Sequence, residues 1–407
     1  MAAGPVLALI DGEHHPPAVR DALDRIERER GLAGVVFCGG EEKLAPGPLD
    51  GHYGRPVEVE PERALRRLAP SAQAVVDLAD EPVLAPPARL RLAALALHLG
   101  LDYEAPGARL TPPRFERVAF AGPKLAVIGS GKRTGKTAVA GHWAGLLRTA
   151  GAEPVIVCMG RGGPPGPEPA EPGLGLEQLL AMAARGRHAA SDHIENAVLA
   201  GVRTVGCRRV GGGLAGEPAE SNVREGAALA ASLEPDALIF EGSGSSLPPV
   251  EVDRTVCVAG TGALDALGAY RLLRARLALV GDGAEEHAVA AVCPGRVMCF
   301  ELHPEPAEPL PDGARVALFT TGAGRPAGIE PVVTSQNLAR RGALAHDLRR
   351  AAAERCDLYL TELKAAAIDT VAARAGSEEA RVVFLRNRPE GVGGDLDEAL
   401  LEVWRGA

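Results

Sequence analysis

The chain has 407 residues, of which 46% are apolar and only 3% are aromatic, and it carries a formal net charge of -9. This length exceeds what one hydrophobic core normally organises, so two domains, or one large sheet with a smaller appended one, are expected. The negative charge and the absence of long basic runs argue against a general nucleic-acid-binding protein, because such proteins need many phosphate contacts.

The N-terminal stretch MAAGPVLALIDGEHHPP has no basic region, and its apolar run is too short for a signal peptide. No window approaches the length of a membrane span. The seven cysteines are scattered without a CxxC pair, mostly in or beside apolar runs, which is typical of buried thiols in a reducing cytosol. A cytoplasmic protein without a membrane partner is therefore expected.

Residues 1–120 are predicted to form a small, Rossmann-like βαβ domain. Apolar runs at 6–10, 33–37 and 74–78 alternate with charge-rich, helix-like stretches, and a further helix is expected around 88–99. Acidic and histidine side chains follow these strands. They are Asp11, Glu13, His14 and His15 after the first, and Asp77, Asp80 and Glu81 after the third.

Two interpretations of these strand-end residues stay open. The histidine pair could hold an anion, relay a proton or bind a metal, and an ordinary solvent-exposed pair fits equally well. No third ligand stands at metal spacing, so a zinc site is not expected. The acidic residues of VVDLADEP could bind a cation or cap a turn.

Residues 121–407 are predicted to form a second, larger α/β domain with a doubly wound, mostly parallel sheet. The expected strands are 124–129, 154–159, 236–241, 254–258, 276–280, 296–301, 315–319, 357–361 and 381–385. Residues 160–235 interrupt the alternation and are predicted to be a long loop and helical insertion. Its Pro/Gly segment RGGPPGPEPAEPG is either a mobile loop near the active site or an inert linker.

The stretch KLAVIGSGKRTGKTA, residues 124–138, predicts a phosphate-binding P-loop between a strand and a helix. Such a loop needs backbone N–H groups around phosphate oxygens, a lysine for the terminal phosphates and a hydroxyl for Mg²⁺. The common GxxxxGK[ST] spacing would place glycine at 130, where this chain has serine. The expected nucleotide-binding residues are Gly129, Ser130, Gly131, Lys132, Arg133, Thr134, Gly135, Lys136 and Thr137.

A second element of a Mg²⁺–nucleotide site is predicted at ALIFEGSGS. Glu241 ends an apolar strand, and the glycines after it would let a ligand approach. With Thr137 it would ligate the metal; the alternative is a glutamate that caps the following turn.

Several basic residues are expected to gather near this site, because the carboxyl ends of parallel strands share one edge of the sheet. Lys132 and Arg133 lie in the loop itself. Arg161, Arg208, Arg209 and Lys364 follow other predicted strands. Together they indicate a strongly anionic second ligand besides ATP.

The displaced glycine of the loop resembles the dethiobiotin synthetase and ParA/MinD-like branch of P-loop proteins. Glu241 resembles the metal-ligating glutamate of the EG(A/S)G element in dethiobiotin synthetase. In the MinD-like form a lysine stands where this chain has Gly131, so the role of that lysine cannot be transferred to Lys132. Asn387 and Pro389 follow the last strand, where related enzymes recognise adenine; a plain turn is an equal alternative.

The whole pattern resembles the cyclic 2,3-diphosphoglycerate synthetase family. The matching blocks run from LIDGEHHPP through GSGKRTGKTA and SDHIENAVLAGV to YLTELKAAAIDTVA, residues 9 to about 372. The resemblance implies a cytoplasmic ligase, expected here as a homodimer. It would use ATP and Mg²⁺ to join the two phosphates of 2,3-diphosphoglycerate as an anhydride, releasing ADP and phosphate.

On this interpretation the catalytic residues are Lys132, Arg133, Lys136 and Glu241. The substrate would be held by His14, His15, Arg161, Arg208, Arg209 and Lys364. Two alternatives remain: a dethiobiotin-synthetase-like ligase acting on another anion, and a nucleotide-switch regulator or metallochaperone. Neither an NKxD motif nor a His/Cys-rich tract, which the second alternative would favour, is present in the sequence.

Overall fold

The computed structural model describes residues 4–281, 283–322 and 324–407. The chain divides into two compact units. The first comprises Met1–Arg114 with Gly262–Arg274 and Ala291–Pro294, and the second comprises Phe115–Thr261, Ala275–Ala290 and Gly295–Ala407. Within the described residues, no helix is both long and apolar enough to cross a lipid bilayer.

The first unit is built on a six-stranded sheet in the order β3-β2-β1-β4-β5-β6, parallel except for the β5–β6 pair. Its strands are β1 (Val6–Ile10), β2 (Leu32–Phe37), β3 (Val57–Glu58), β4 (Ala74–Asp77), β5 (Asp102–Ala105) and β6 (Ala108–Leu110). Its helices are α1 (Pro16–Arg30), α2 (Leu49–Tyr53), α3 (Pro61–Leu68), α4 (Pro86–His98) and α9 (Gly268–Leu273), with short 3-10 turns η1 (Glu41–Lys43) and η2 (Ala69–Ser71). The expected βαβ pattern is present, with α4 packed against α9.

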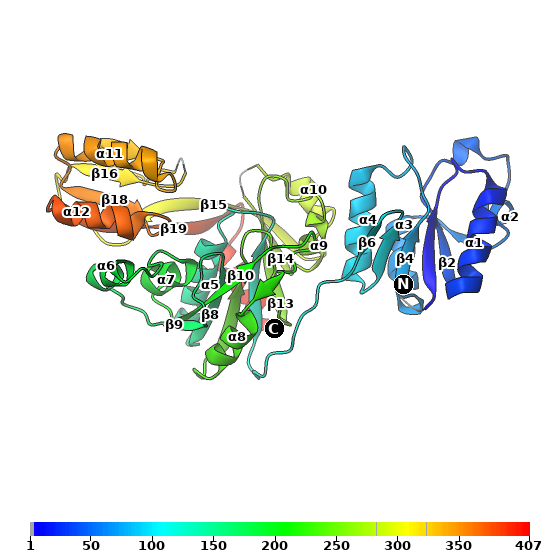
Figure 1. Ribbon diagram of the computed structural model, residues 1–407, viewed down its shortest axis with the longest axis horizontal. Helices are drawn as coiled ribbons and strands as arrows, with labels where there is room; N and C mark the ends of the chain where they lie inside the picture. The colour runs from blue at the N-terminus through cyan, green and yellow to red at the C-terminus, as the bar shows by residue number, and fades with distance from the viewer. Residues whose placement is uncertain (1–3, 282, 323) are drawn as a thin grey trace. The chain divides into compact units, whose positions relative to one another are not determined.

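The second unit carries one thirteen-stranded sheet, most of whose strand pairs are parallel. Its first strands are β7 (Lys124–Gly129), β8 (Pro154–Gly160), β9 (Glu168–Ala170), β10 (Thr204–Val210), β11 (Glu220–Ser221), β12 (Ala237–Glu241), β13 (Arg254–Ala259) and β14 (Leu277–Val280). The remaining strands are β15 (Arg296–Pro306), β16 (Val316–Phe319), β17 (Val333–Ser335), β18 (Leu358–Glu362) and β19 (Arg381–Val392). Figure 1 shows these strands together with the helices that surround them.

The helices of the second unit follow from the apolar spacing of their sequences. They are α5 (Lys136–Thr149), α6 (Leu176–Ala184), α7 (Asp192–Glu195), α8 (Val223–Ala231), α10 (Glu286–Ala290), α11 (Arg341–Ala353), α12 (Ala373–Ser377) and α13 (Leu396–Arg405), with π-helical turns η3 (Asn196–Ala200) and η4 (Ala367–Ala372). On α5, Val139, Trp143 and Leu147 recur at four-residue spacing and are fully buried against β7. This packing fixes where the helix begins, directly after the predicted P-loop.

Strand β10 corrects the expectation that residues 160–235 are only loop and helix. The strand pairs in parallel with β8, and β9 from the Pro/Gly segment forms an antiparallel pair with it. The segment TVGCRRV has too few apolar residues to show a strand period. Its inward-facing positions are nevertheless buried, including those of Cys207 and Arg209.

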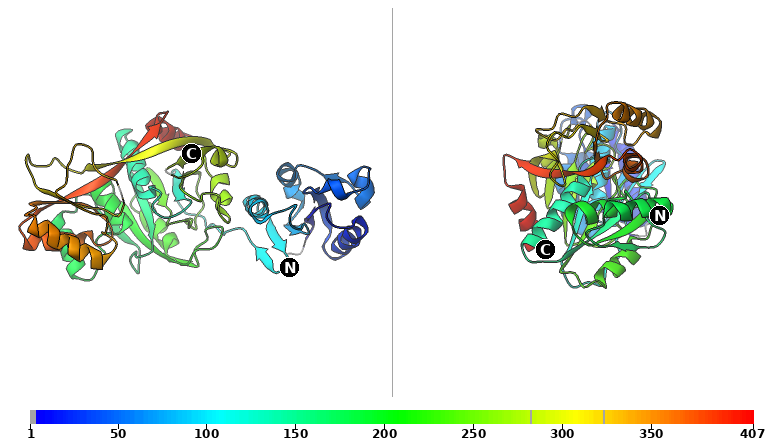
Figure 2. Two further views of the ribbon diagram at one scale, coloured as in Figure 1. Left: turned by 90° about the horizontal axis from the view of Figure 1, so that it is seen from above. Right: turned by 90° about the vertical axis from the view of Figure 1, so that its left-hand side faces the viewer.

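Strands β15 and β19 reverse the direction of the sheet. The first half of β15 pairs in parallel with β14, and its second half pairs antiparallel with β19, from Cys299↔Val392 to Pro306↔Leu385. Strands β18 and β16 then run parallel to β19. Their carboxyl ends consequently point back towards the carboxyl ends of β7, β8 and β12. The two long strands are drawn in yellow and red in Figure 2.

Candidate active site

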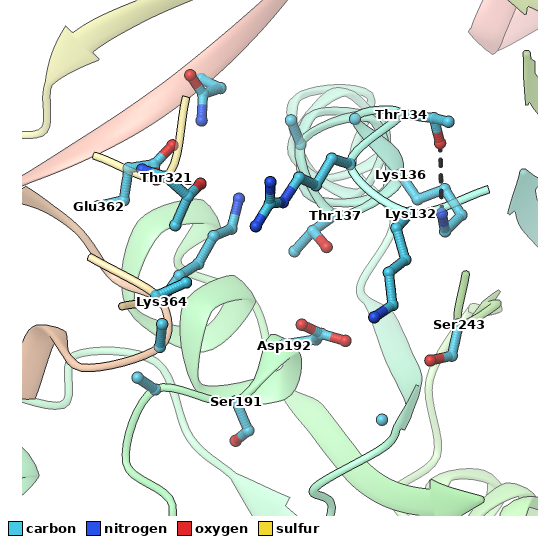
Figure 3. A pocket seen from close by; sticks show the side chains of 18 of the residues that line it. Lys132, Thr134, Lys136, Thr137, Ser191, Asp192, Ser243, Thr321, Glu362 and Lys364 are labelled. Atoms are coloured by element: carbon cyan, nitrogen blue, oxygen red, sulfur yellow. Dashed lines mark hydrogen bonds between the residues drawn. The ribbon is translucent and has the colours of Figure 1, made fainter. Parts of the chain in front are cut away.

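A cavity of about 640 Å³ lies where these two sets of carboxyl ends face one another. Its lining comes from the P-loop, the segments after β8 and β12, the start of α7, and the ends of β16 and β18. The charged residues that line it are Lys132, Arg133, Lys136, Arg161, Asp192, Glu241, Glu362 and Lys364. Figure 3 shows Thr321, Glu362 and Lys364 on one side of the cavity, Lys132 and Ser243 on the other, and Asp192 between them.

The P-loop begins at Gly129 and ends at Gly135, the N-cap of α5. A Cβ at Gly129 would lie 2.9 Å from Thr134 Oγ1, and Gly135 has φ +98°, so both positions need glycine. Ser130 stands where the common spacing has glycine, and its hydroxyl accepts a hydrogen bond from Gly260 N at 2.9 Å. The loop is therefore tied to the end of β13 at this position.

Two basic side chains of the loop are exposed and have no hydrogen-bond or ion-pair partner within the described part of the chain: Lys132 and Arg133. Arg133 also has φ +60°, a left-handed conformation that costs free energy in a residue other than glycine. Charged, unpaired side chains on a strained loop are suited to an anionic ligand.

Lys136 is buried at the first position of α5. Its ammonium donates to the carbonyl oxygen of Gly131 at 2.6 Å and to Thr134 Oγ1 at 3.3 Å, the latter drawn in Figure 3. Burial lowers the pKa of Lys136 to about 8, although Glu241 and Asp192 oppose this shift. Phosphate oxygens at the loop would favour the charged form of the lysine.

Thr137 and Glu241 form the predicted metal-site pair. The Thr137 hydroxyl donates to Glu241 Oε1 at 2.6 Å, and the Asn196 amide donates to Glu241 Oε2 at 3.0 Å. Burial, assisted by the negative charge of Asp192, raises the pKa of Glu241 to about 8. A cation beside this carboxylate would reverse that shift, because it favours the charged form.

Helix α7 and the first residue of η3 contribute three polar residues that the sequence analysis did not assign. Asp192, Glu195 and Asn196 stand at positions i, i+3 and i+4, which share one face of a helix. Asp192 lines the cavity, Asn196 holds Glu241, and Glu195 Oε1 lies 3.1 Å from Lys364 Nζ. The spacing D-x-x-E-N in SDHIENAV was the available signal.

The Glu195–Lys364 ion pair joins α7 to the end of β18. Burial alone would lower the pKa of Lys364, but Glu195 and Glu362 outweigh burial and raise it. Lys364 therefore carries a positive charge into the cavity. Close by, Glu362 Oε2 accepts hydrogen bonds from both Thr321 N and Thr321 Oγ1 at 2.7 Å.

The remaining predicted substrate residues, Arg208, Arg209, His14 and His15, do not line the cavity. Arg209 is buried beneath the Ser243 turn, whereas its neighbour Arg208 is exposed and, like Arg209, is not among the residues that line the cavity. His14 and His15 belong to the first unit, and the cavity is lined entirely by the second.

The strand-end residues of the first unit have structural partners. His14 Nδ1 lies 2.7 Å from Asp11 Oδ1. Asp77 accepts hydrogen bonds from Ala79 N and from Tyr103, and it pairs with Arg89 at 2.8 Å. The turn-capping interpretation therefore accounts for Asp77.

A second cavity of about 360 Å³ adjoins the first and shares Thr137, Ala138 and Asn387 with it. It runs along one side of α5, and residues of η3, β15 and β19 also line it. Asn387 and Pro389, the candidate adenine contacts, both line it. The first cavity therefore continues into a smaller cleft along the helix.

Three family models match the chain. They describe the N-terminal domain of cyclic 2,3-diphosphoglycerate synthetase (residues 5–111), its P-loop domain (124–290) and its C-terminal domain (324–388). Curated proteins named cyclic 2,3-diphosphoglycerate synthetase also match. That of Rubrobacter xylanophilus is 45% identical and covers 98% of this chain and 97% of its own. The Thermococcus gammatolerans protein is 37% identical, and the match covers 98% of this chain and 96% of that protein.

Among solved structures, a DUF1611 family protein from Anabaena variabilis has 14% sequence identity and a TM-score of 0.19. The match covers 69% of this chain and 74% of the other. A TM-score this low does not indicate a shared fold.

The buried carboxyl of Glu241 predicts a pH-dependent loss of stability. Below its unfolded pKa of 4.5, both states are protonated; between pH 4.5 and about 8 only the unfolded state ionises, so stability falls as pH rises. Glu241→Gln should remove this slope. Between pH 5 and pH 8, the free energy of unfolding measured in urea should fall by about 1–3 kcal/mol more in the wild type than in the variant. Parallel pH curves would contradict the buried, raised pKa.

Proposed function

The chain belongs to the cyclic 2,3-diphosphoglycerate synthetase family, and we propose that it uses ATP to join the two phosphates of 2,3-diphosphoglycerate as a cyclic anhydride, releasing ADP and phosphate. The observation that carries the proposal is a single cavity where a P-loop meets an excess of basic side chains. Five cationic residues line it against three acidic ones, and a nucleotide alone would not require so many.

The nucleotide is proposed to lie across both cavities. Its β- and γ-phosphates would meet the backbone N–H groups of the P-loop and Lys136, as the strand–loop–helix geometry favours. The adjoining cavity along α5 would then receive the adenosine. Its size, its contact with the first turn of α5 at Thr137 and Ala138, and the amide of Asn387 at the junction all support this assignment.

Magnesium is proposed at Thr137 and Glu241, with Asp192 facing the same space. No group of three His, Cys, Asp or Glu side chains suited to a metal occurs among the described residues. Mg²⁺ does not require one, since it commonly uses one or two carboxylates together with phosphate oxygens and water. When bound, the ion would neutralise charge on the phosphates. The 2.6 Å contact between Thr137 and Glu241 brings a hydroxyl and a carboxylate together where such a ligand set is needed.

The proposed reaction has two phosphoryl steps. An oxygen of one substrate phosphate attacks the γ-phosphorus of ATP, forming a P–O bond as the bond to ADP breaks. An oxygen of the second substrate phosphate then attacks the phosphorus of the first substrate phosphate, which carries the transferred γ-phosphoryl group. This attack closes the cyclic anhydride and expels the transferred group as inorganic phosphate. The substrate supplies both nucleophiles, so no protein nucleophile is needed.

In this mechanism the chain contributes position and positive charge. Lys136 would support the γ-phosphate, while Lys132 and Arg133 would offset repulsion between the nucleotide and the substrate. The exposed, unpaired state of these two loop residues supports that role. The expected homodimer and cytoplasmic location stay predictions.

The activity is tested by incubating the purified protein with ATP, Mg²⁺ and 2,3-diphosphoglycerate and following phosphorus NMR. A new cyclic anhydride signal is expected, with one ADP and one phosphate released for each product molecule. ATP hydrolysis that ignores 2,3-diphosphoglycerate would exclude the proposal.

Lys132→Ala is expected to lower kcat about 100-fold or more while leaving the affinity for ATP within a few-fold, because its charge acts where the two phosphates meet. Steady-state kinetics and equilibrium binding of a non-hydrolysable ATP analogue separate the two effects. A collapse of nucleotide binding with normal residual turnover would assign Lys132 to the nucleotide instead.

Gly145→Leu tests the adenosine cavity. Gly145 lines this cavity on α5, and a Cβ there meets no atom within 4 Å, so the larger side chain should fill the cleft without disturbing the helix. The KM for ATP should rise about tenfold or more, with the KM for 2,3-diphosphoglycerate unchanged. Gly145→Ala is the matched control and should behave as wild type. An unchanged KM for ATP in the leucine variant would place the base elsewhere.

A further inference from the structure

Arg161 and Arg209 converge on one turn of the cavity wall, the segment that follows β12. The turn is closed by two backbone hydrogen bonds between Ser243 and Ser246, and Gly244 at its tip has φ +62°. A Cβ built on Gly244 would lie 2.3 Å from Nη2 of Arg161 and 3.6 Å from Nη2 of Arg209. Both guanidinium groups therefore pack against the bare backbone of this glycine.

Arg209 is held beneath the turn by neutral partners. Its Nη2 donates to Ser243 O at 2.8 Å and lies 3.5 Å from Ser243 Oγ, and its Nη1 donates to Gly211 O. The residue is 7% exposed, and its buried Nε has no partner in the part of the chain that the structure describes. A Cβ built on Gly212, which follows β10, would lie 2.8 Å from Ser246 Oγ, so this glycine lets the chain pass close to the same turn.

No carboxylate balances this pair among the ion pairs of the described residues. Arg161 is exposed to the cavity and has neither a hydrogen bond nor an ion pair there. Burial and the charge of Arg161 both lower the pKa of Arg209. Two adjacent guanidinium groups without an acid leave a positive potential, which a doubly charged phosphate would relieve.

We infer that Arg161, Ser243 and the Gly244 turn, supported from below by Arg209, form a subsite for one phosphate of the bisphosphorylated substrate. This inference rests on the proposed function. Arg161 touches the phosphate and Arg209 is a positioning residue that holds the Ser243 turn and adds charge behind it. The subsite lies beside the P-loop, since Arg161, Ser243 and Gly244 line the same cavity as the loop.

The position of the subsite also suits a substrate with two phosphates. Lys364 approaches the cavity from the opposite set of strand ends, with Thr321 and Glu362, as Figure 3 shows. The second phosphate of the same molecule therefore has a separate cation available. A ligand with only one phosphate would leave one of these positions unused.

The chain provides a matched control on the same strand. Arg208 and Arg209 are neighbours on β10, and successive side chains of a strand point to opposite faces. Arg208 is exposed, lies outside the cavity lining and uses its backbone N–H to bond Asn222. Arg208→Gln makes the same chemical change as Arg209→Gln without touching the Ser243 turn.

The test compares Arg161→Gln, Arg209→Gln and Arg208→Gln. The first two should raise the KM for 2,3-diphosphoglycerate about 10- to 100-fold while the KM for ATP changes less than about threefold. The Arg208 variant should match wild type in both constants. Equal rises in both KM values, or no rise for 2,3-diphosphoglycerate in the Arg161 variant, would overturn the subsite.

Direct binding separates this inference from the catalytic one. Calorimetry of the wild type should show tighter binding of 2,3-diphosphoglycerate than of 3-phosphoglycerate, and Arg161→Gln should abolish most of that preference. A variant that keeps the preference contradicts the subsite even if the wild type makes the cyclic product. A wild type that shows the preference without forming product retains the subsite and excludes the proposed reaction. Because Arg161 is exposed, Arg161→Gln should keep the wild-type melting temperature. The test therefore still holds if Arg209→Gln fails to fold.

Discussion

The reversal of strand direction between β15 and β19 is the constraint on which the cavity depends. Because β19 runs antiparallel to β15, the strands that pair with it present their carboxyl ends towards those of β7, β8 and β12. A single parallel edge would gather polar loops on one side only. Here two such edges face each other, and the cavity between them receives charged side chains from both.

Buried polar contacts then fix the distance between the two edges. The segment formed by α7 and η3 bonds Glu241 through Asn196, the first residue of η3, and pairs with Lys364 through Glu195, the last residue of α7. A cluster of buried apolar residues, including Leu179, Ile194 and Ile368, packs the same region. This segment therefore links the buried carboxylate of Glu241 to the lysine at the far edge, and a change on its polar face should disturb both.

Electrostatics explains why the site combines so many cations with a few acids. Joining two phosphates opposes their mutual repulsion, and each fixed positive charge lowers that cost. Unpaired basic residues would repel one another in the free protein, so they lie on an exposed loop, as Lys132 and Arg133 do, or rest on neutral carbonyls, as Arg209 does. The resulting strain and unbalanced charge are located where the ligands would bind.

The sequence by itself determined the α/β class, the nucleotide loop and the expected strands of both units, because apolar runs and glycine-rich turns are local signals. It also paired Thr137 with Glu241, and in the structure Thr137 Oγ1 lies 2.6 Å from Glu241 Oε1. The sequence did not reveal β10, whose seven residues TVGCRRV lack an apolar alternation, or the polar face of α7. Only the tertiary structure decided that Lys364 approaches from a facing edge and that Arg209, not Arg208, supports the cavity wall. Strand direction and the face to which a side chain points depend on pairing between distant segments, which local patterns do not specify.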